Sequence, residues 1–141
     1  MIWRNRVFLA AVIAWAAAQT IKVVLDLIKN RKFSAERLVG AGGMPSSHTA
    51  FVIALVTAVA RYAGVESVAF AVSAAFALVT MYDATGIRRA AGEQAKILNY
   101  MMDNWKQPPE MFQKDLKELL GHTPVEVLVG GVLGFVIGLL V

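Results

Sequence analysis

The chain has 141 residues, of which 57% are hydrophobic and 17% are charged, and it contains no cysteine. This length suits a single domain over residues 1–141, and the absence of cysteine excludes disulfides, thiolate catalysis and zinc–thiolate sites. The formal net charge is +4, but the basic residues lie between long apolar runs without interleaved aromatic residues, which argues against nucleic acid and favours anionic lipid as the partner.

Four apolar segments predict an all-α integral membrane protein, a helical bundle of about four transmembrane helices. They cover residues 7–28, 49–63, 65–82 and 125–141, so their lengths run from 15 to 22 residues. The segments lack the alternation of strands, and the shorter ones lie at or just under the ~17 to 25 residues of a helical span. The mean hydropathy of +0.58 also leaves few polar residues to cover a water-facing surface. A soluble bundle of unusually apolar helices is the alternative.

The first segment carries ionisable residues. Lys22 lies on roughly the same helical face as Gln19 and Asp26. Because a charge within a span is costly to desolvate, Lys22 is a functional candidate, and an ion pair with Asp26 is the competing explanation. These polar residues also argue against a cleaved signal peptide.

The sequence GGMPSSH at residues 42–48 precedes the second segment. Gly43 permits close backbone approach, and Ser46 and Ser47 can cap a helix that begins near His48, leaving N–H groups directed outward. Such a helix N-terminus favours an anion such as phosphate. An ordinary N-cap turn would explain the serines but not a histidine at this junction.

The sequence DATGIRR at residues 83–89 follows the third segment. Arg88 and Arg89 suit bidentate binding of phosphate oxygens at a membrane boundary, and Asp83 is a further candidate for the same site. Simple interfacial anchoring is the alternative for the arginines.

Two amphipathic helices are predicted next, over residues 89–105 and 110–120. The apolar stripe of the first includes Ile97, Leu98 and Met101, and Gly121 is placed to end the second. Helices of this kind lie in the headgroup layer as interfacial helices or pack against the bundle, and both placements are open here.

The sequence GHTPVE at residues 121–126 precedes the last segment and contains the second of the two histidines of the chain. With Pro124 at the helix start, His122 and Glu126 stand one helical turn apart, so the carboxylate can contact the imidazole. A carboxylate so placed orients the ring and stabilises its cation.

A glycine ridge runs along the last segment, where Gly130, Gly134 and Gly138 recur every fourth residue. Such a ridge lets another helix approach closely. It suits packing within the chain and a homo-oligomer equally well.

The number of predicted spans implies that the two long polar segments lie on the same side of the membrane. With four crossings, residues 29–48 and 83–123 share one face, which holds ten Lys and Arg against three on the opposite face. The positive-inside bias makes the ten-residue face cytoplasmic, and both histidines lie there.

With these motifs, the chain resembles the divergent PAP2 family, a branch of the type 2 phosphatidic acid phosphatase superfamily, which is related to vanadium haloperoxidases. The superfamily motif PSGH supplies a general-acid histidine and is similar to residues 45–48, with Ser47 in place of glycine. A later His-x-x-x-Asp motif is similar to His122 and Glu126, with Glu in place of Asp. Lys22 is similar to an early lysine of the superfamily. The superfamily arginine shortly before the nucleophile has no match here, and we expect Arg88 or Arg89, displaced by the inserted amphipathic segment, to substitute for it.

The resemblance implies a multi-pass cell-membrane phosphatase that needs no metal and no cofactor. In it, His122 attacks a lipid phosphomonoester, Glu126 orients His122, and His48 protonates the leaving alkoxide. The substrate would be of the phosphatidylglycerophosphate or phosphatidic acid type. An isoprenyl (di)phosphate phosphatase and a non-catalytic lipid-phosphate-binding membrane protein are the alternatives, and a transporter component is a third. The phosphate ligands that the family resemblance implies are Lys22, Ser46, Ser47, Arg88 and Arg89.

Overall fold

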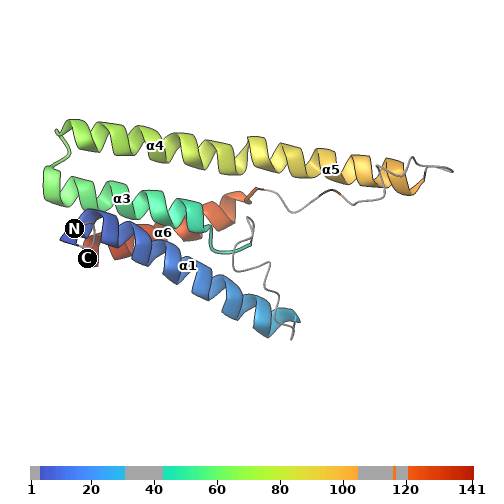
Figure 1. Cartoon of the computed structure of the whole chain (residues 1–141), viewed down its shortest axis with the longest axis horizontal. Helices are drawn as coiled ribbons and strands as arrows, with labels where there is room; N and C mark the ends of the chain where they lie inside the picture. The colour runs from blue at the N-terminus through green and yellow to red at the C-terminus, as the bar shows by residue number, and fades with distance from the viewer. Residues whose placement is uncertain (1–3, 31–42, 105–115, 117–120) are drawn as a thin grey trace.

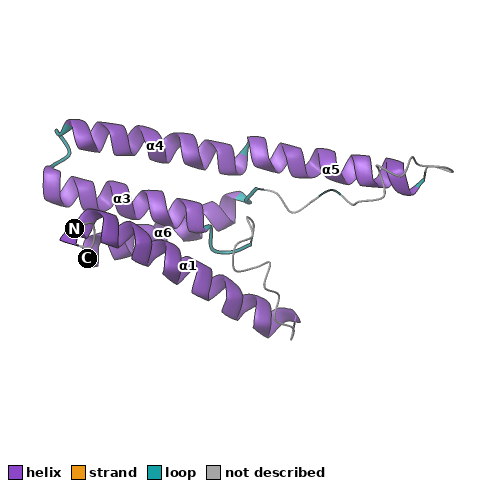
Figure 2. Cartoon of the chain, in the orientation of Figure 1, coloured by secondary structure: helices purple, strands orange, loops and turns teal. Residues whose placement is uncertain are grey.

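The fold is all-α throughout the part of the chain that the structure describes, with no strand in it (Figure 2). The computed structural model describes residues 4–30, 43–104, 116 and 121–141. The predicted amphipathic helix at 110–120 therefore falls outside the described residues, apart from Leu116. The helices of the described part are α1 (Arg6–Asn30), α3 (Ser47–Ala63), α4 (Val68–Thr85), α5 (Ile87–Asp103) and α6 (Pro124–Leu140).

Helix α3 is the centre of the bundle, because it packs against α1, α4 and α6. The C-terminal end of α4 and the N-terminal ends of α3 and α6 lie at one end of the bundle, and α1 also runs toward that end (Figure 1). The chain termini and the α3–α4 turn lie at the other end. The described ends of the two polar segments thus lie at one end of the bundle, as the count of spans predicts.

The apolar segments fold as four helices close to the predicted bounds. Two stretches are long and apolar enough to cross a membrane, Arg6–Ile28 in α1 and Val68–Asp103, which covers α4 and α5. Helices α3 and α6 are also apolar but have 17 residues each. The start of α4 was predicted three residues too early. Gly64, at a φ of 85°, ends α3, and the Ser67 hydroxyl accepts the N–H of Phe70 at 3.1 Å, so the helix begins only at Val68.

Helices α3 and α6 pack closely because of the glycine ridge. Gly130, Gly134 and Gly138 are buried. A methyl group added at Gly130 would overlap the backbone carbonyl of Ser46, the N-cap of α3, and one added at Gly134 would overlap the carbonyl of Ala50 in α3. The ridge therefore serves packing within the chain. Association of copies of the chain stays a prediction.

Helix α5 extends beyond the ends of α3 and α6, continuing from α4 after Gly86 (Figure 1). Its buried residues are Gly92, Ala95 and Asn99, whereas the predicted apolar stripe of Ile97, Leu98 and Met101 is exposed. The stripe therefore does not pack against the described helices of the bundle. Its apolar side chains are not covered by the described part of the chain.

Candidate active site

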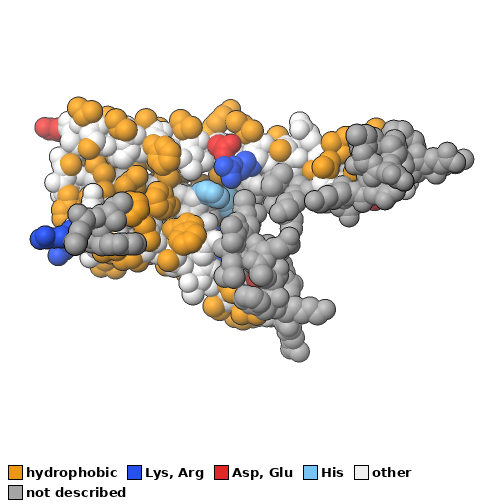
Figure 3. Space-filling view, viewed as in Figure 1, with side chains coloured by type: hydrophobic (Ala, Val, Ile, Leu, Met, Phe, Trp, Pro, Cys, Tyr) orange, Lys and Arg blue, Asp and Glu red, His pale blue; other side chains and the backbone are white. Residues whose placement is uncertain are grey.

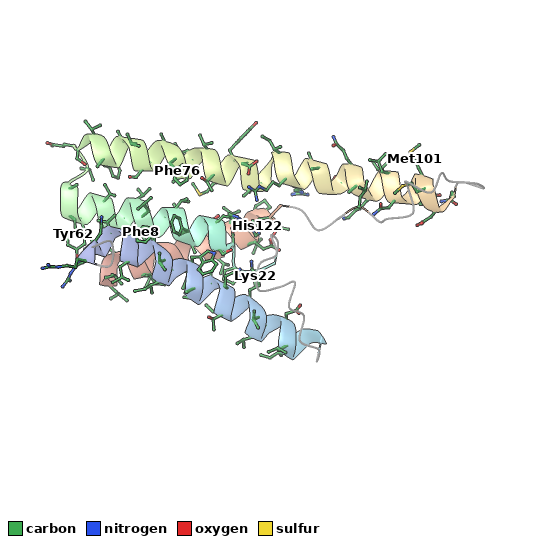
Figure 4. All side chains as sticks on the ribbon, viewed as in Figure 1. Phe8, Lys22, Tyr62, Phe76, Met101 and His122 are labelled. Atoms are coloured by element: carbon green, nitrogen blue, oxygen red, sulfur yellow. The ribbon has the colours of Figure 1, made fainter. Side chains whose placement is uncertain are left out.

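The two histidines of the chain meet at the polar end of the bundle. Their ring centroids are 5.8 Å apart and the rings are inclined by 61°. His48 lies in the first turn of α3, and His122 lies two residues before α6. Figure 4 shows His122 at this end of the bundle, with Lys22 of α1 nearby. Residues separated by more than seventy positions in the sequence thus form one pair.

Glu126 holds the His122 ring. The Nδ1 atom of His122 lies 3.0 Å from Oε2 of Glu126, the contact that the spacing predicts. The same carboxylate accepts the N–H of Thr123 at 3.2 Å, and the Thr123 hydroxyl accepts the N–H of Glu126 at 3.3 Å. This reciprocal capping box, with Pro124 at the helix start, fixes the carboxylate where α6 begins.

The other ring nitrogen of His122 is the chemically significant atom. With Nδ1–H assigned as the donor to Glu126, Nε2 carries the lone pair. Nε2 is buried and has no hydrogen-bond partner among the described residues. A buried polar atom without a partner costs free energy, so it marks a site that is suited to a reacting group or ligand.

Two backbone contacts, which the sequence did not indicate, set the depth of His122. Its N–H donates to the carbonyl of Ala84 at 2.9 Å, in the last turn of α4. Gly121 has a φ of 84°, and a methyl group there would overlap the backbone of Arg89. Only glycine fits this approach, so the segment before α6 is held against the α4–α5 junction.

Ser46 takes the N-cap role that the sequence predicts, and its backbone N–H makes a further contact that the sequence did not indicate. Its hydroxyl accepts the N–H of Thr49 at 3.3 Å as the N-cap of α3, and its own N–H donates to the carbonyl of Glu126 at 3.0 Å. The Ser46 N–H is thus already used and is not open to a phosphate. The first-turn N–H groups of Ser47 and His48 have no acceptor within their own helix. Gly43, with a φ of 84°, precedes this loop.

Among the described residues, Lys22 and Arg88 carry the positive charges that act on the histidine pair. Lys22 is buried on α1, and its charge and that of Arg88 act on both imidazoles. Arg88 extends from the first turn of α5, where its Nε lies 2.6 Å from Oδ2 of Asp83. Figure 3 shows a histidine on this face next to a basic group, which in turn adjoins an acidic group.

Arg89 is directed elsewhere. Its Nε lies 3.5 Å from Oε1 of Glu93, and both side chains are more than half exposed. The cations that act on His48 and His122 include Arg88 but not Arg89. Of the two adjacent arginines that the sequence left equivalent, the structure brings Arg88 to the histidines.

The environment of His122 favours its neutral form. Burial lowers the pKa of His122 below its ordinary value of about 6.5, and the charges of Lys22 and Arg88 lower this pKa further. The hydrogen bond and charge of Glu126 raise the pKa again, but only in part. The imidazole is therefore unprotonated near neutral pH and its Nε2 lone pair is available. No three His, Asp or Glu side chains gather in a metal-binding arrangement within the described ranges.

Comparisons with known proteins agree with the motifs. A family model described as the divergent PAP2 family matches residues 3–137, which include both histidine motifs. The chain is also similar to an uncharacterized membrane protein of Bacillus subtilis (strain 168), YuiD. The two are 44% identical over 146 residues, which cover 96% of this chain and 92% of that protein. No solved structure matches the chain.

Proposed function

The chain belongs to the divergent PAP2 family, and from this premise we propose that it is a membrane-embedded histidine phosphatase that hydrolyses lipid phosphomonoesters without a metal. The observation that carries this proposal is the buried Nε2 of His122, which has no partner among the described residues. The centroid of this ring lies 5.8 Å from that of His48. A lone pair held in this way is poised for attack on phosphorus.

The first step transfers the phosphoryl group to the enzyme. Nε2 of His122 attacks phosphorus, an Nε2–P bond forms, and the P–O bond to the lipid alcohol breaks. Protonated His48 gives its proton to the leaving oxygen, so the alcohol departs neutral. Glu126 holds Nδ1–H and stabilises the positive charge that the His122 ring gains.

The second step regenerates the enzyme. Neutral His48 takes a proton from water as the water oxygen attacks phosphorus, and the Nε2–P bond breaks. Inorganic phosphate leaves, His122 recovers its lone pair, and His48 is protonated again. The net reaction consumes one ester and one water and yields one alcohol and one phosphate.

Positive charge around the pair would stabilise the transferring phosphoryl group. Lys22 and Arg88 act on both rings, and the first-turn N–H groups of Ser47 and His48 add the field of a helix N-terminus. Removal of one such positioned donor typically slows turnover by ~10² to 10³. Arg88 is the arginine we assign to the phosphate.

A bilayer location follows from the apolar helices. Helix α1 and the stretch Val68–Asp103 have the length and composition of spans, and the similar protein of Bacillus subtilis is described as a membrane protein. In the sequence, the two long polar segments hold ten Lys and Arg against three on the opposite face, and this positive-inside bias supports a cytoplasmic histidine end. Alkaline carbonate washing of membranes tests this location: the chain should stay in the pellet, and its release into the supernatant would contradict a spanning bundle.

The cytoplasmic side favours a phospholipid phosphomonoester of the phosphatidylglycerophosphate or phosphatidic acid type as substrate. The test is phosphate release from a panel of lipid phosphates by the purified protein, with His122→Ala as the control. We expect release that is lost in the variant, and acid-labile phosphohistidine on the native chain. Binding of these lipids without hydrolysis or phosphohistidine would instead make the chain a lipid-phosphate-binding protein.

A further inference from the structure

We propose that a groove at the end of the bundle away from the histidines binds an anionic phospholipid of the opposite leaflet, with one acyl chain in the groove and the phosphate at Arg61. This site is separate from the proposed phosphatase site and depends only on the location of the chain in a bilayer. The groove has a volume of about 460 Å³, within the range of about 300 to 1,000 Å³ that is typical of ligand sites.

Three helices form the groove. Its floor is α3, between Ile53 and Arg61, and its walls are Phe70 of α4 and Phe135 and Leu139 of α6. Helices α4 and α6 each pack against α3 but make few contacts with each other, so a furrow is left between them. Phe135 and Leu139 are each about half exposed. The groove is therefore open toward the outside of the bundle.

The groove lies far from the histidines. Arg61 is in the last turn of α3, whereas His48 is in the first. The two residues stand thirteen positions apart, which is about 20 Å along an α-helix. The Arg61 end also carries the chain termini and the α3–α4 turn (Figure 1). In a bilayer, the groove therefore lies in the leaflet opposite the histidine pair.

The groove suits hydrocarbon. Apart from Arg61, its lining has one polar side chain, Thr57, whose hydroxyl donates to the carbonyl of Ile53 at 2.8 Å. The lining therefore offers water or a sugar no free polar group along the floor. An acyl chain needs none, and van der Waals contact with the apolar walls is what stabilises packing inside a bilayer.

Arg61 is held at one end of this groove. Its Nη1 donates to the carbonyl of Gly138 at 3.1 Å, and its Cζ lies 5.4 Å from the centroid of the Tyr62 ring. Neither contact neutralises the guanidinium charge. Within the described ranges no carboxylate pairs with Arg61, and this includes Glu66 on the turn after α3. The remaining guanidinium N–H groups suit the oxygens of a phosphate.

The order of these features along α3 matches a phospholipid. The cation stands in the last helical turn, at the depth of the headgroups, and Tyr62 beside it is a residue type that is enriched at that depth. The apolar floor extends from there toward the middle of the bilayer. One molecule can thus place its phosphate at Arg61 and its acyl chain in the groove. The uncompensated charge of Arg61 favours this occupant over an apolar helix of a second copy.

The experiment uses the full chain in phosphatidylcholine vesicles that contain a trace of phosphatidylglycerol with a diazirine on one acyl chain. This probe is a phosphodiester, so the proposed phosphatase does not hydrolyse it. Arg61→Gln removes the charge and keeps a donor for the Gly138 carbonyl, whereas Ala60→Leu fills the floor. Arg6→Gln is the control for charge, at the start of α1 at the same end. Ala63→Leu is the control for size, at an exposed position of α3 outside the groove.

After illumination, mass spectrometry of peptides locates the label. We expect it on the groove segments of α3 and α6. In Arg61→Gln the labelling at low probe concentration should fall about tenfold, as expected for loss of one charge-assisted hydrogen bond. Ala60→Leu should lose most of the label, and both controls should keep it. Equal labelling in all variants, or label spread evenly over the exposed apolar faces, would overturn the proposal.

Native mass spectrometry distinguishes a lipid from a second copy of the chain. Bound phospholipid that is lost in Ala60→Leu supports the lipid site. A dimer that Ala60→Leu dissociates, without bound lipid, would assign the groove to a second copy and overturn the proposal. Circular dichroism checks the fold, and Arg61→Gln decides the question if Ala60→Leu does not fold. Absence of phosphatase activity in the native chain would leave this labelling unchanged, so the two conclusions fail separately.

Discussion

The backbone N–H of Ser46 donates to the carbonyl of Glu126 at 3.0 Å. This bond joins the loop before His48 directly to the first turn of the helix after His122, so the two histidines are held by one short backbone link. The link requires α3 and α6 to approach within backbone contact at Gly130. The separation of the two rings is therefore set by helix packing as well as by the motifs themselves.

Gly130→Ala should push the two helix starts apart. The added methyl group would overlap the Ser46 carbonyl, and overpacking of this kind costs ~1 to 3 kcal/mol. We expect a lower Tm and a loss of phosphatase activity that is larger than the loss of folded protein. Gly131→Ala is the matched control, because its methyl group would lie 3.7 Å from the nearest side-chain atom. Equal effects of the two substitutions would show that the close approach does not matter.

Glu126→Gln should change the pH dependence of kcat/KM. Glu126 raises the pKa of His122, and its charge is lost in the variant, so the pKa of His122 falls further below its ordinary value. Because the protonated ring cannot attack, activity is lost as the pH falls through that pKa. The acidic limb of the profile should therefore move to lower pH.

The same substitution should lower kcat by roughly 10² to 10⁴, because the cation that forms on His122 loses its stabilising charge. Glutamine still offers an oxygen to the Thr123 N–H, so the start of α6 should be kept. Circular dichroism checks the fold. An acidic limb that stays in place, or that moves to higher pH, would contradict the assigned role of the carboxylate.

His48→Ala should produce a loss that depends on the leaving group. Release of an alkoxide needs a proton, so hydrolysis of an alkyl phosphate should slow by ~10² to 10⁴. An aryl phosphate with an acidic phenol leaves without that proton and should still phosphorylate His122, giving a burst of phenol and accumulated phosphohistidine. Equal losses on both esters would mean that His48 is not the general acid.

Arg88→Ala and Arg89→Ala should differ strongly, although the residues are adjacent. Arg88 acts on both histidines, and its removal should lower kcat/KM by ~10² to 10³. Arg89 forms an exposed pair with Glu93, an interaction worth about 0 to 1 kcal/mol, so its removal should change kcat/KM only a few-fold. Steady-state kinetics on one lipid phosphate is the measurement. The opposite order would transfer the phosphate-binding role to Arg89.

Local spacing was enough to predict several features. Apolar runs predicted the four helices of the bundle, and the four-residue separation predicted the contact of His122 with Glu126, because an α-helix places such residues on one face. The count of four spans put residues 29–48 and 83–123 on one side of the membrane, and this predicted that His48 and His122 meet at one end of the bundle. The family followed from the motifs, since they are short and local and can be read without knowing which helices touch.

The tertiary structure decided the features that depend on how helices are rotated against one another. Two adjacent arginines look alike in sequence, yet of the two only the charge of Arg88 acts on the histidines, because consecutive helix positions point about 100° apart. The use of the Ser46 N–H by Glu126, the α3 partner of the glycine ridge and the exposure of the α5 stripe are likewise contacts between distant segments. Periodicity reports which side chains share a face of one helix, but only packing determines what that face meets.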